Sequence, residues 1–303
     1  MKPATLFLDD LSLVYVEPDV QPAGIIQFVV GIWEHKERYL PLMEFLSTHG
    51  FATLCHDLRG HGATAKSPAE LGYIGKGGWK TLVEDVRKVA QWARKQWPSR
   101  PLNLFSHSMG SLIARSFLKR HDDEVDRVIL SGSPSYNPAT PAGLALTGVI
   151  SLLGGRKCRS KAIQGLAFDS FNKKYKQEGY PRAWICSDKA VQKAYHEDPL
   201  CQFTLTVDAV RNMLFLVRDT YSPRGWQMAH PDLPVLFLAG EEDPCLVSPQ
   251  AFHKAVAAMR DHGYRNVSVR TYPGMRHEVH NETGKEKVWN DILAFFSTGS
   301  LSE

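Results

Sequence analysis

Short apolar runs alternate with longer segments of helical period along most of this chain. The apolar runs are rich in β-branched residues and predict buried or half-buried strands over 11–16, 24–30, 51–55, 102–106, 125–130, 235–239 and 267–272. Strands that alternate with helices are typical of parallel strands joined by crossover helices. The pattern therefore predicts an α/β fold with a mostly parallel central sheet flanked by helices.

The clearest helical segment covers 79–96, and Pro98 ends it. Its apolar side chains fall on one stripe, namely Leu82, Val86, Val89, Ala90 and Ala93. Segments 249–262 and 286–296 show a similar period, with Ser248 as the N-cap of the first and Gly263 as its stop. These three segments should pack one face against the sheet.

The alternation lapses between about 135 and 224, where Pro, Gly and Ser clusters enclose an apolar stretch over 142–153. We therefore predict a core made of 1–134 and 225–303, with an inserted cap over 135–224. The apolar stretch is far shorter than the roughly 20 residues that span a bilayer. It is either a helix buried against the core or a lid whose apolar face meets acyl chains or a membrane or micelle surface.

Composition favours a single large globular unit. Hydrophobic residues are 43% and charged residues 22% of the 303 residues, close to the usual ~45–50% and ~25%. The 36 basic and 32 acidic residues are scattered, so no nucleic-acid partner is expected. The acidic pair Asp9 and Asp10 interrupts the N-terminal segment before it reaches the apolar length of an export signal. The five cysteines form no C-x-x-C pair. These features predict a cytoplasmic protein with reduced thiols, and they carry no indication of its oligomeric state.

The segment Ser106-His107-Ser108-Met109-Gly110 joins a predicted strand to a helical run over 112–119. A tight strand-to-helix turn projects a serine hydroxyl clear of the sheet and needs small residues two positions to either side. Gly110 meets that requirement, and Ser106 departs from the usual glycine but is small and unbranched. Ser108 is the predicted nucleophile.

A carboxylate and a histidine follow in the order that this kind of fold requires. Asp243 comes just after the strand over 235–239 and is the predicted acid, with Glu241 and Glu242 as competitors. His277 comes just after the strand over 267–272 and is the predicted base, because an imidazole can take and return a proton near neutral pH.

Two other histidines are rivals for the base. His280 lies three residues further on, where we expect the following helix. His107 is adjacent to Ser108 in an extended segment, so its side chain should point the other way. We also expect two backbone amides to stabilise an oxyanion, those of Met109 and Ile32.

With these residues in place, the chain resembles the monoglyceride lipase and lysophospholipase branch of the α/β-hydrolases (serine aminopeptidase S33 type). Besides the segments of Ser108, Asp243 and His277, and the cap run Asp198-Pro199-Leu200-Cys201, two motifs carry the resemblance. Gly31-Ile32-Trp33-Glu34-His35-Lys36-Glu37-Arg38-Tyr39 is similar to the family's H-G-x-G-E-H-x-x-R-Y, and Asp57-Leu58-Arg59-Gly60-His61-Gly62 to its D-x-R-G-x-G.

The chain departs from the family at Val30, where His is usual, at Trp33, where Gly is usual, and at Ser106. Val30 removes a polar side chain near the oxyanion loop, and we expect Trp33 to narrow the acyl entrance. Asp57, Arg59 and His61 are interpreted as structural braces for their loop, with substrate binding as the alternative.

The resemblance implies an α/β-hydrolase fold and hydrolysis of a carboxylic ester with one acyl chain, through an acyl-enzyme on Ser108. A small-molecule acyl ester would be the substrate, and no metal or organic cofactor is implied. Cys245 is either a buried bystander or a thiol near the site. Two alternatives stay open: hydrolysis of a thioester, amide or carbon-carbon bond on the same triad, and a non-catalytic binding protein of this fold.

Overall fold

A computed structural model describes residues 2–301, and within this range eight strands form one sheet in the order β1-β2-β4-β3-β5-β6-β7-β8. From β3 to β8 all neighbouring strands are parallel, whereas β2 is antiparallel to both β1 and β4. The strands are β1 (Ala4–Leu8), β2 (Leu11–Val16), β3 (Gly24–Val29), β4 (Phe51–His56), β5 (Leu102–His107), β6 (Arg127–Ser131), β7 (Val235–Gly240) and β8 (Val267–Tyr272). The predicted mostly parallel sheet is confirmed, and β1 is an additional strand.

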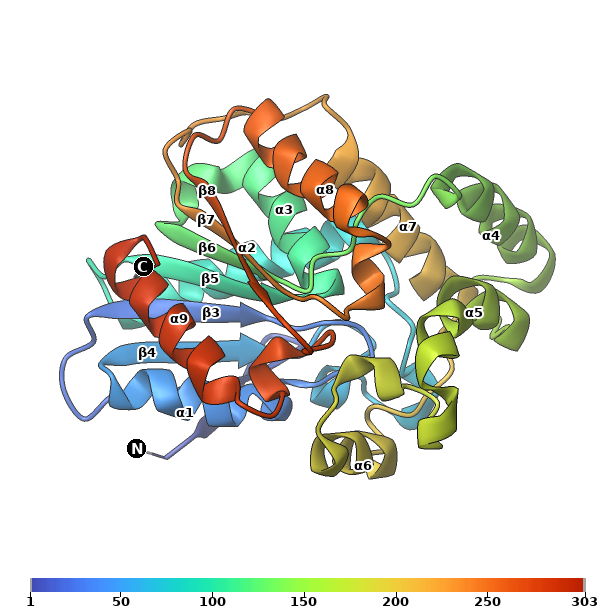
Figure 1. The fold of residues 1–303 in the computed structure, drawn as a ribbon, viewed down its shortest axis with the longest axis horizontal. Coiled ribbons are helices and arrows are strands. Elements are labelled where there is room, and N and C mark those ends of the chain that lie inside the picture. Colours follow the sequence, from blue (N-terminus) through green and yellow to red (C-terminus); the bar gives the residue numbers. More distant parts are fainter. Residues whose placement is uncertain (1, 302–303) are drawn as a thin grey trace.

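Helices cover both faces of the sheet. The pair α1 (Leu40–Thr48) and α9 (Lys285–Thr298) lie side by side, α2 (Trp79–Gln96) packs against α3 (Met109–His121), and α8 (Pro249–Asp261) packs against β8 (Figure 1). The predicted stripe on α2 is buried, and Ser248 caps α8 by accepting from the Ala251 amide. Short 3-10 turns within the loops are η1 (Lys36–Tyr39), η2 (Gly62–Thr64), η3 (Pro68–Glu70), η4 (Asp122–Glu124), η7 (Pro244–Leu246) and η8 (Val279–Asn281).

A helical segment connects β6 to β7 and lies beyond the carboxyl ends of the parallel strands (Figure 1). It contains α4 (Thr140–Gly154), α5 (Lys161–Phe168), η5 (Asp169–Glu178), η6 (Ala183–Ile185), α6 (Lys189–Glu197) and α7 (Val207–Tyr221). We call residues 135–224 the cap segment. Its division from the core stays a prediction, because α7 packs against α4 on one side and α3 on the other.

Helix α4 exposes most of its apolar side chains. Only Thr140 and Thr147 are buried in it, whereas Leu152 is 87% and Leu153 is 85% exposed. The interpretation of the stretch over 142–153 as a helix buried against the core is therefore wrong. Across residues 2–301, helices that combine the length and the apolarity needed to cross a membrane are absent.

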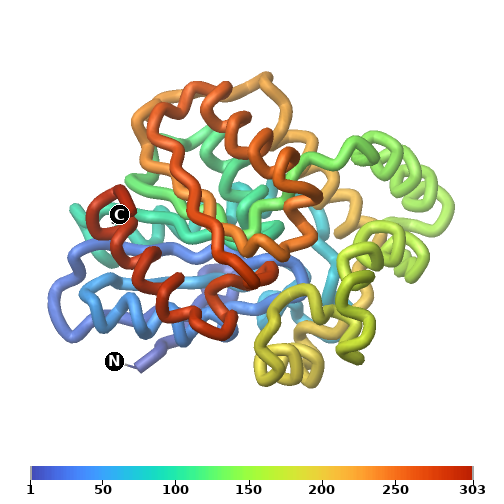
Figure 2. Tube along the Cα trace, viewed as in Figure 1, coloured from blue at the N-terminus to red at the C-terminus, as the bar shows by residue number. Residues whose placement is uncertain are grey.

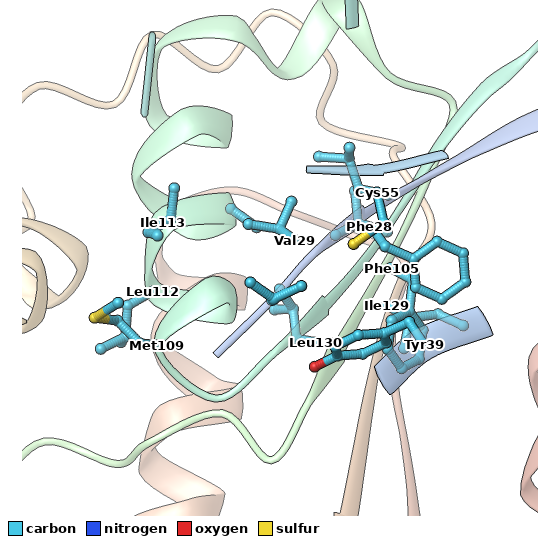
Figure 3. Packing of buried hydrophobic residues seen from close by; sticks show 14 of the residues in the cluster. Phe28, Val29, Tyr39, Cys55, Phe105, Met109, Leu112, Ile113, Ile129 and Leu130 are labelled. Carbon is cyan, nitrogen blue, oxygen red and sulfur yellow. The ribbon is translucent and has the colours of Figure 1, made fainter. Parts of the chain in front are cut away.

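The hydrophobic core beneath the turn after β5 is densely packed. Phe28 on β3 contacts Phe105 on β5 at a ring-centroid distance of 5.1 Å, and Tyr39 lies 5.8 Å from Phe28. Figure 3 shows Val29 between these rings and Ile113 of α3. Figure 2 shows the cap segment to one side of the sheet, beyond the strand ends that this core holds in place.

Candidate active site

Ser108 occupies the sharp turn between β5 and α3. Its backbone has φ 52° and ψ −123°, a conformation that side-chain-bearing residues rarely adopt. Such a strained strand-to-helix turn is how this fold exposes a nucleophile. Gly110 makes the turn feasible, because a Cβ at that position would lie 2.2 Å from the Val29 carbonyl oxygen.

Ser106, the departure from the usual glycine, fits within the sheet. It is fully buried, and its hydroxyl donates a hydrogen bond of 2.8 Å to the Ile129 carbonyl on neighbouring β6. A buried hydroxyl with a partner carries little desolvation cost. The substitution is therefore accommodated without loss of the turn.

Asp243 and His277 meet at the carboxyl edge of the sheet. Asp243 follows β7 and His277 follows β8, and the Nδ1 atom of His277 lies 2.8 Å from Oδ2 of Asp243. The other carboxylate oxygen of Asp243 accepts the Cys245 amide at 2.8 Å. This arrangement fixes the Nδ1–H tautomer and leaves Nε2 for proton transfer.

The competing acids are engaged elsewhere. Glu241 accepts a hydrogen bond of 3.0 Å from the Thr271 hydroxyl, and Glu242 pairs with Lys174 and Tyr175. Neither carboxylate bonds to His277 in the described structure, so Asp243 is the acid that the geometry favours.

The environment of His277 favours its protonated form. Burial alone would lower the pKa of His277, but the adjacent Asp243 carboxylate raises it well above its ordinary value. Trp184 from the cap segment packs 4.9 Å from the His277 ring and helps to exclude water. A protonated His277 is thus stabilised in place.

The side chain of His107 packs against His277 and does not line the cavity that Ser108 borders, so its direction relative to Ser108 stays a prediction. Its ring lies 4.5 Å from that of His277 and 5.0 Å from that of His280, which sits in η8 rather than in α9. Burial holds the pKa of His107 well below its usual range and lowers that of His280 to about 4. Both rings are neutral, and together with His277 they form a packed cluster that the sequence pattern did not reveal.

The two predicted oxyanion amides belong to residues that border the same cavity as Ser108. Ile32 follows β3, and Met109 begins α3. Among residues 2–301, neither amide has a hydrogen-bond acceptor, as expected for a donor at a helix start or in a turn that awaits a ligand. The geometry is compatible with both predictions.

Glu34 braces this loop from below, a role that sequence reasoning missed. Its Oε2 atom accepts the Gly31 amide at 2.7 Å and the Tyr39 hydroxyl at 2.9 Å. Burial and the nearby Glu278 carboxylate raise the pKa of Glu34 to about 7. The sequence feature that could have indicated this role is the position of Glu34 within the segment similar to H-G-x-G-E-H.

A cavity of about 420 Å³ lies between this site and the cap segment. Its lining includes Ile32, Ser108, Met109, Ser135, Trp184 and Cys245, and the rest of it comes mostly from apolar side chains of α4, α5 and α7. None of the residues lining it carries a charge. Trp33 is not among them, so the expectation that it narrows the acyl entrance is wrong.

Several buried side chains could in principle ligate a metal. The group Asp243, Cys245 and His277 brings donor atoms within 4.8 Å of one another, as does the group His35, Asp198 and Cys201. The carboxylates and imidazoles of both groups already bond to each other, at 2.8 Å in the first group and 2.7 Å in the second. The donor sets therefore fit protein hydrogen bonding without an ion.

The contacts of the Asp57 loop support the interpretation of Asp57, Arg59 and His61 as structural residues. Asp57 is fully buried and pairs with Lys36 at 2.8 Å, while Arg59 pairs with Asp85 at 2.7 Å. His61 is buried too, and none of Asp57, Arg59 and His61 lines the cavity.

Comparison with known proteins places this geometry in a family. The model of the family described as serine aminopeptidase, S33 matches residues 20–284. The chain is 24% identical over 280 residues to a monoacylglycerol lipase of Mycolicibacterium smegmatis, covering 92% of this chain and 89% of that one. It is also 24% identical over 276 residues to phospholipase YtpA of Bacillus subtilis, covering 91% and 95%.

A solved carboxyl esterase from Bacillus coagulans superposes with a TM-score of 0.89 at 24% identity, covering 98% of this chain and 97% of that one. The fold is therefore that of the α/β-hydrolases, as the sequence predicted. With the matched family model spanning most of the chain, the protein belongs to the serine aminopeptidase S33 family of α/β-hydrolases.

Proposed function

We propose that the protein hydrolyses carboxylic esters that carry one acyl chain, with Ser108 as nucleophile, His277 as base and Asp243 as its orienting acid. The observation that carries this proposal is the 2.8 Å bond between Asp243 and His277 beside an apolar cavity that Ser108 lines. The names of the relatives, which are lipases, phospholipases and esterases, support it.

The chemistry follows from these positions. Neutral His277 takes the Ser108 proton as the hydroxyl oxygen attacks the ester carbonyl, and the amides of Ile32 and Met109 stabilise the resulting oxyanion. The imidazolium then protonates the departing alcohol, which leaves an acyl-enzyme. Water, activated by the same imidazole, releases the carboxylic acid and restores Ser108.

We propose a neutral leaving group, such as glycerol, in preference to a charged one. The cavity has no charged residue in its lining, so a phosphate headgroup inside it would lose water without gaining a cation. The same argument disfavours a peptide substrate with a free amino terminus, because no carboxylate lines the cavity to pair with it. A monoacylglycerol is therefore favoured over a lysophospholipid or an aminoacyl amide.

We further propose that α4 and α5 touch a membrane or micelle surface transiently. Leu152, Leu153 and Leu166 are 87%, 85% and 75% exposed; exposed Lys157 lies between the two helices, and exposed Lys161 begins α5. A cluster of exposed apolar residues flanked by cations is typical of interfacial contact. The free cysteines fit a reducing compartment such as the cytoplasm.

The main test uses purified protein, p-nitrophenyl esters and a panel of monoacylglycerols, lysophospholipids and aminoacyl p-nitroanilides. Ser108→Ala should abolish turnover and labelling by a fluorophosphonate while the circular dichroism spectrum stays unchanged. Undiminished turnover in that variant would exclude the proposed nucleophile. Faster cleavage of lysophospholipids than of monoacylglycerols would exclude the neutral-substrate proposal.

The surface proposal has its own test. Replacing Leu152 and Leu153 with Ser should reduce the preference for micellar over monomeric esters, with Phe7→Ser as the control because Phe7 is 64% exposed on β1, an edge strand of the sheet outside the cap segment. An unchanged micellar preference in the double variant would contradict it.

A further inference from the structure

Trp33 holds an unusual backbone conformation next to a predicted oxyanion amide. Its φ is 60°, in the left-handed region that disfavours bulky side chains. The residue directly before it is Ile32, which lines the cavity. A tryptophan in this conformation persists only where its surroundings hold it there.

The cap segment supplies those surroundings. The Trp33 indole is 2% exposed, and its Nε1–H donates a hydrogen bond of 2.9 Å to the Phe203 carbonyl. The Arg182 guanidinium lies 3.9 Å from the centroid of the indole, and the Phe168 ring packs edge-on at 4.5 Å. Residues from three separate parts of the cap segment therefore contact the Trp33 side chain and hold it in place.

These partners also connect the indole to the cavity. Phe168 lines the cavity wall, and Arg182 is itself tied to the cap by a 2.6 Å bond to the Cys201 carbonyl. Trp33 thus lies between a wall that an acyl chain would touch and the turn that presents the Ile32 amide. The family's usual glycine at this position could adopt the same φ but could make none of these contacts.

We infer that Trp33 is a positioning residue, through which the cap segment holds the Ile32 amide in the orientation that stabilises the oxyanion. The inference rests on the proposed function of Ile32. Because the indole does not line the cavity, its loss affects stabilisation of the transition state more than binding of a short ester. The expected signature is a fall in kcat with a nearly constant KM.

The experiment compares three side chains at position 33 on p-nitrophenyl butyrate. Trp33→Ala keeps the strain and loses the contacts, so kcat should fall at least about tenfold, towards the roughly 10²–10³-fold cost of losing an oxyanion donor. Trp33→Gly relieves the strain and should fall less. KM should stay within about threefold in both, and the rate of fluorophosphonate labelling should fall in parallel with kcat.

A second set of variants tests the link through the cap. Arg182→Met should lower kcat in the parent but have no further effect in the Trp33→Gly background, because the contact is already gone. Arg218→Met is the matched control, since Arg218 makes an exposed cation–π contact of 4.8 Å with Phe215 on α7. It should leave kcat unchanged.

The outcomes separate the two proposals. A parent protein that neither hydrolyses esters nor labels would refute the proposed function. An active parent whose Trp33→Ala variant keeps the parental kcat, or an Arg182→Met effect that persists in the Trp33→Gly background, would refute the positioning role alone. If Trp33→Ala fails to fold by circular dichroism, the Trp33→Gly and Arg182→Met results decide.

Discussion

The Sγ atom of Cys245 lies 4.0 Å from Nε2 of His277 and within 4.8 Å of the Asp243 carboxylate that bonds to the same ring. Of the two interpretations of Cys245, the thiol near the site is therefore the one that the structure supports. Burial raises the pKa of this thiol to about 11 despite the neighbouring imidazole. At neutral pH it is protonated and a poor nucleophile.

We predict that Cys245→Ala keeps kcat/KM within about threefold of the parent, because a protonated thiol adds little beyond packing at the rim of the cavity. Cys245 should also react with N-ethylmaleimide at pH 7.5 more slowly than Cys158, which is less buried. Peptide mass spectrometry would compare the two sites within one molecule. A loss of activity beyond tenfold in Cys245→Ala would mean that the thiol takes part in the reaction.

The pH dependence of kcat/KM should report His277. The neutral imidazole is the active base, and the folded protein raises its pKa above the ordinary value of 6.5. Activity should therefore be full above the raised pKa and should be lost as the pH falls through it, with the acid-side midpoint above 6.5. A stopped-flow or plate assay from pH 5 to 10 would locate the midpoint, and a value below 6.5 would contradict the assignment.

Asp243→Asn should lower kcat on the order of 10⁴-fold, because the amide no longer fixes the ring tautomer or stabilises the imidazolium. Glu241→Gln, which removes a competing carboxylate that accepts a hydrogen bond from Thr271, is the control and should stay close to the parent. If Glu241→Gln were the inactive variant and Asp243→Asn the active one, the acid would have been misassigned.

The candidate site could be proposed from the sequence because the residues concerned follow strand ends. Asp243 and His277 each come directly after an apolar run, and parallel strands bring their carboxyl ends to one edge. Local pattern and tertiary position therefore coincide. The ends of α2 could be predicted equally well, since a strong amphipathic pattern begins at Trp79 and stops before Pro98.

The misses arise where tertiary contacts override local pattern. Strand alternation predicted that His107 points away from Ser108, but it could not show that the ring of His107 packs against those of His277 and His280. Trp33 was expected to narrow the acyl entrance because a bulky side chain replaces the glycine of the family motif, but the cap residues that bind it are more than a hundred positions away. The exposure of Leu152 could not be read from α4 because that helix is apolar around much of its circumference.

Gly110→Ala should be damaging out of proportion to one methyl group. The new Cβ would lie 2.2 Å from the Val29 carbonyl oxygen, a rigid backbone atom of β3. We expect destabilisation of about 1–3 kcal/mol or more, and a fall in kcat of about 10²-fold if Ser108 shifts by about 1 Å.

Gly148→Ala on α4 is the matched control, because its Cβ meets the flexible end of Arg211 at an ordinary 3.5 Å. Urea unfolding and steady-state kinetics on both variants would show a parental Gly110→Ala if the turn is more tolerant than its geometry indicates.

Glu34 should make the fold less stable as the pH rises. Its pKa is about 7 in the folded protein, against 4.5 for an ordinary glutamate, so the native state binds its proton more tightly than the unfolded state does. This stabilising contribution is fully present below about pH 4.5 and is lost as the pH rises through about 7, an effect on the order of 3 kcal/mol.

Glu34→Gln keeps an oxygen acceptor for Gly31 and cannot ionise, so its free energy of unfolding relative to the parent should increase between pH 5 and pH 8. Contributions from groups shared by both proteins cancel in that difference, and exposed Glu44→Gln on α1 serves as the control. Urea titrations at the two pH values would measure the change, and a difference between Glu34→Gln and the parent that does not vary with pH would show that Glu34 is ionised throughout.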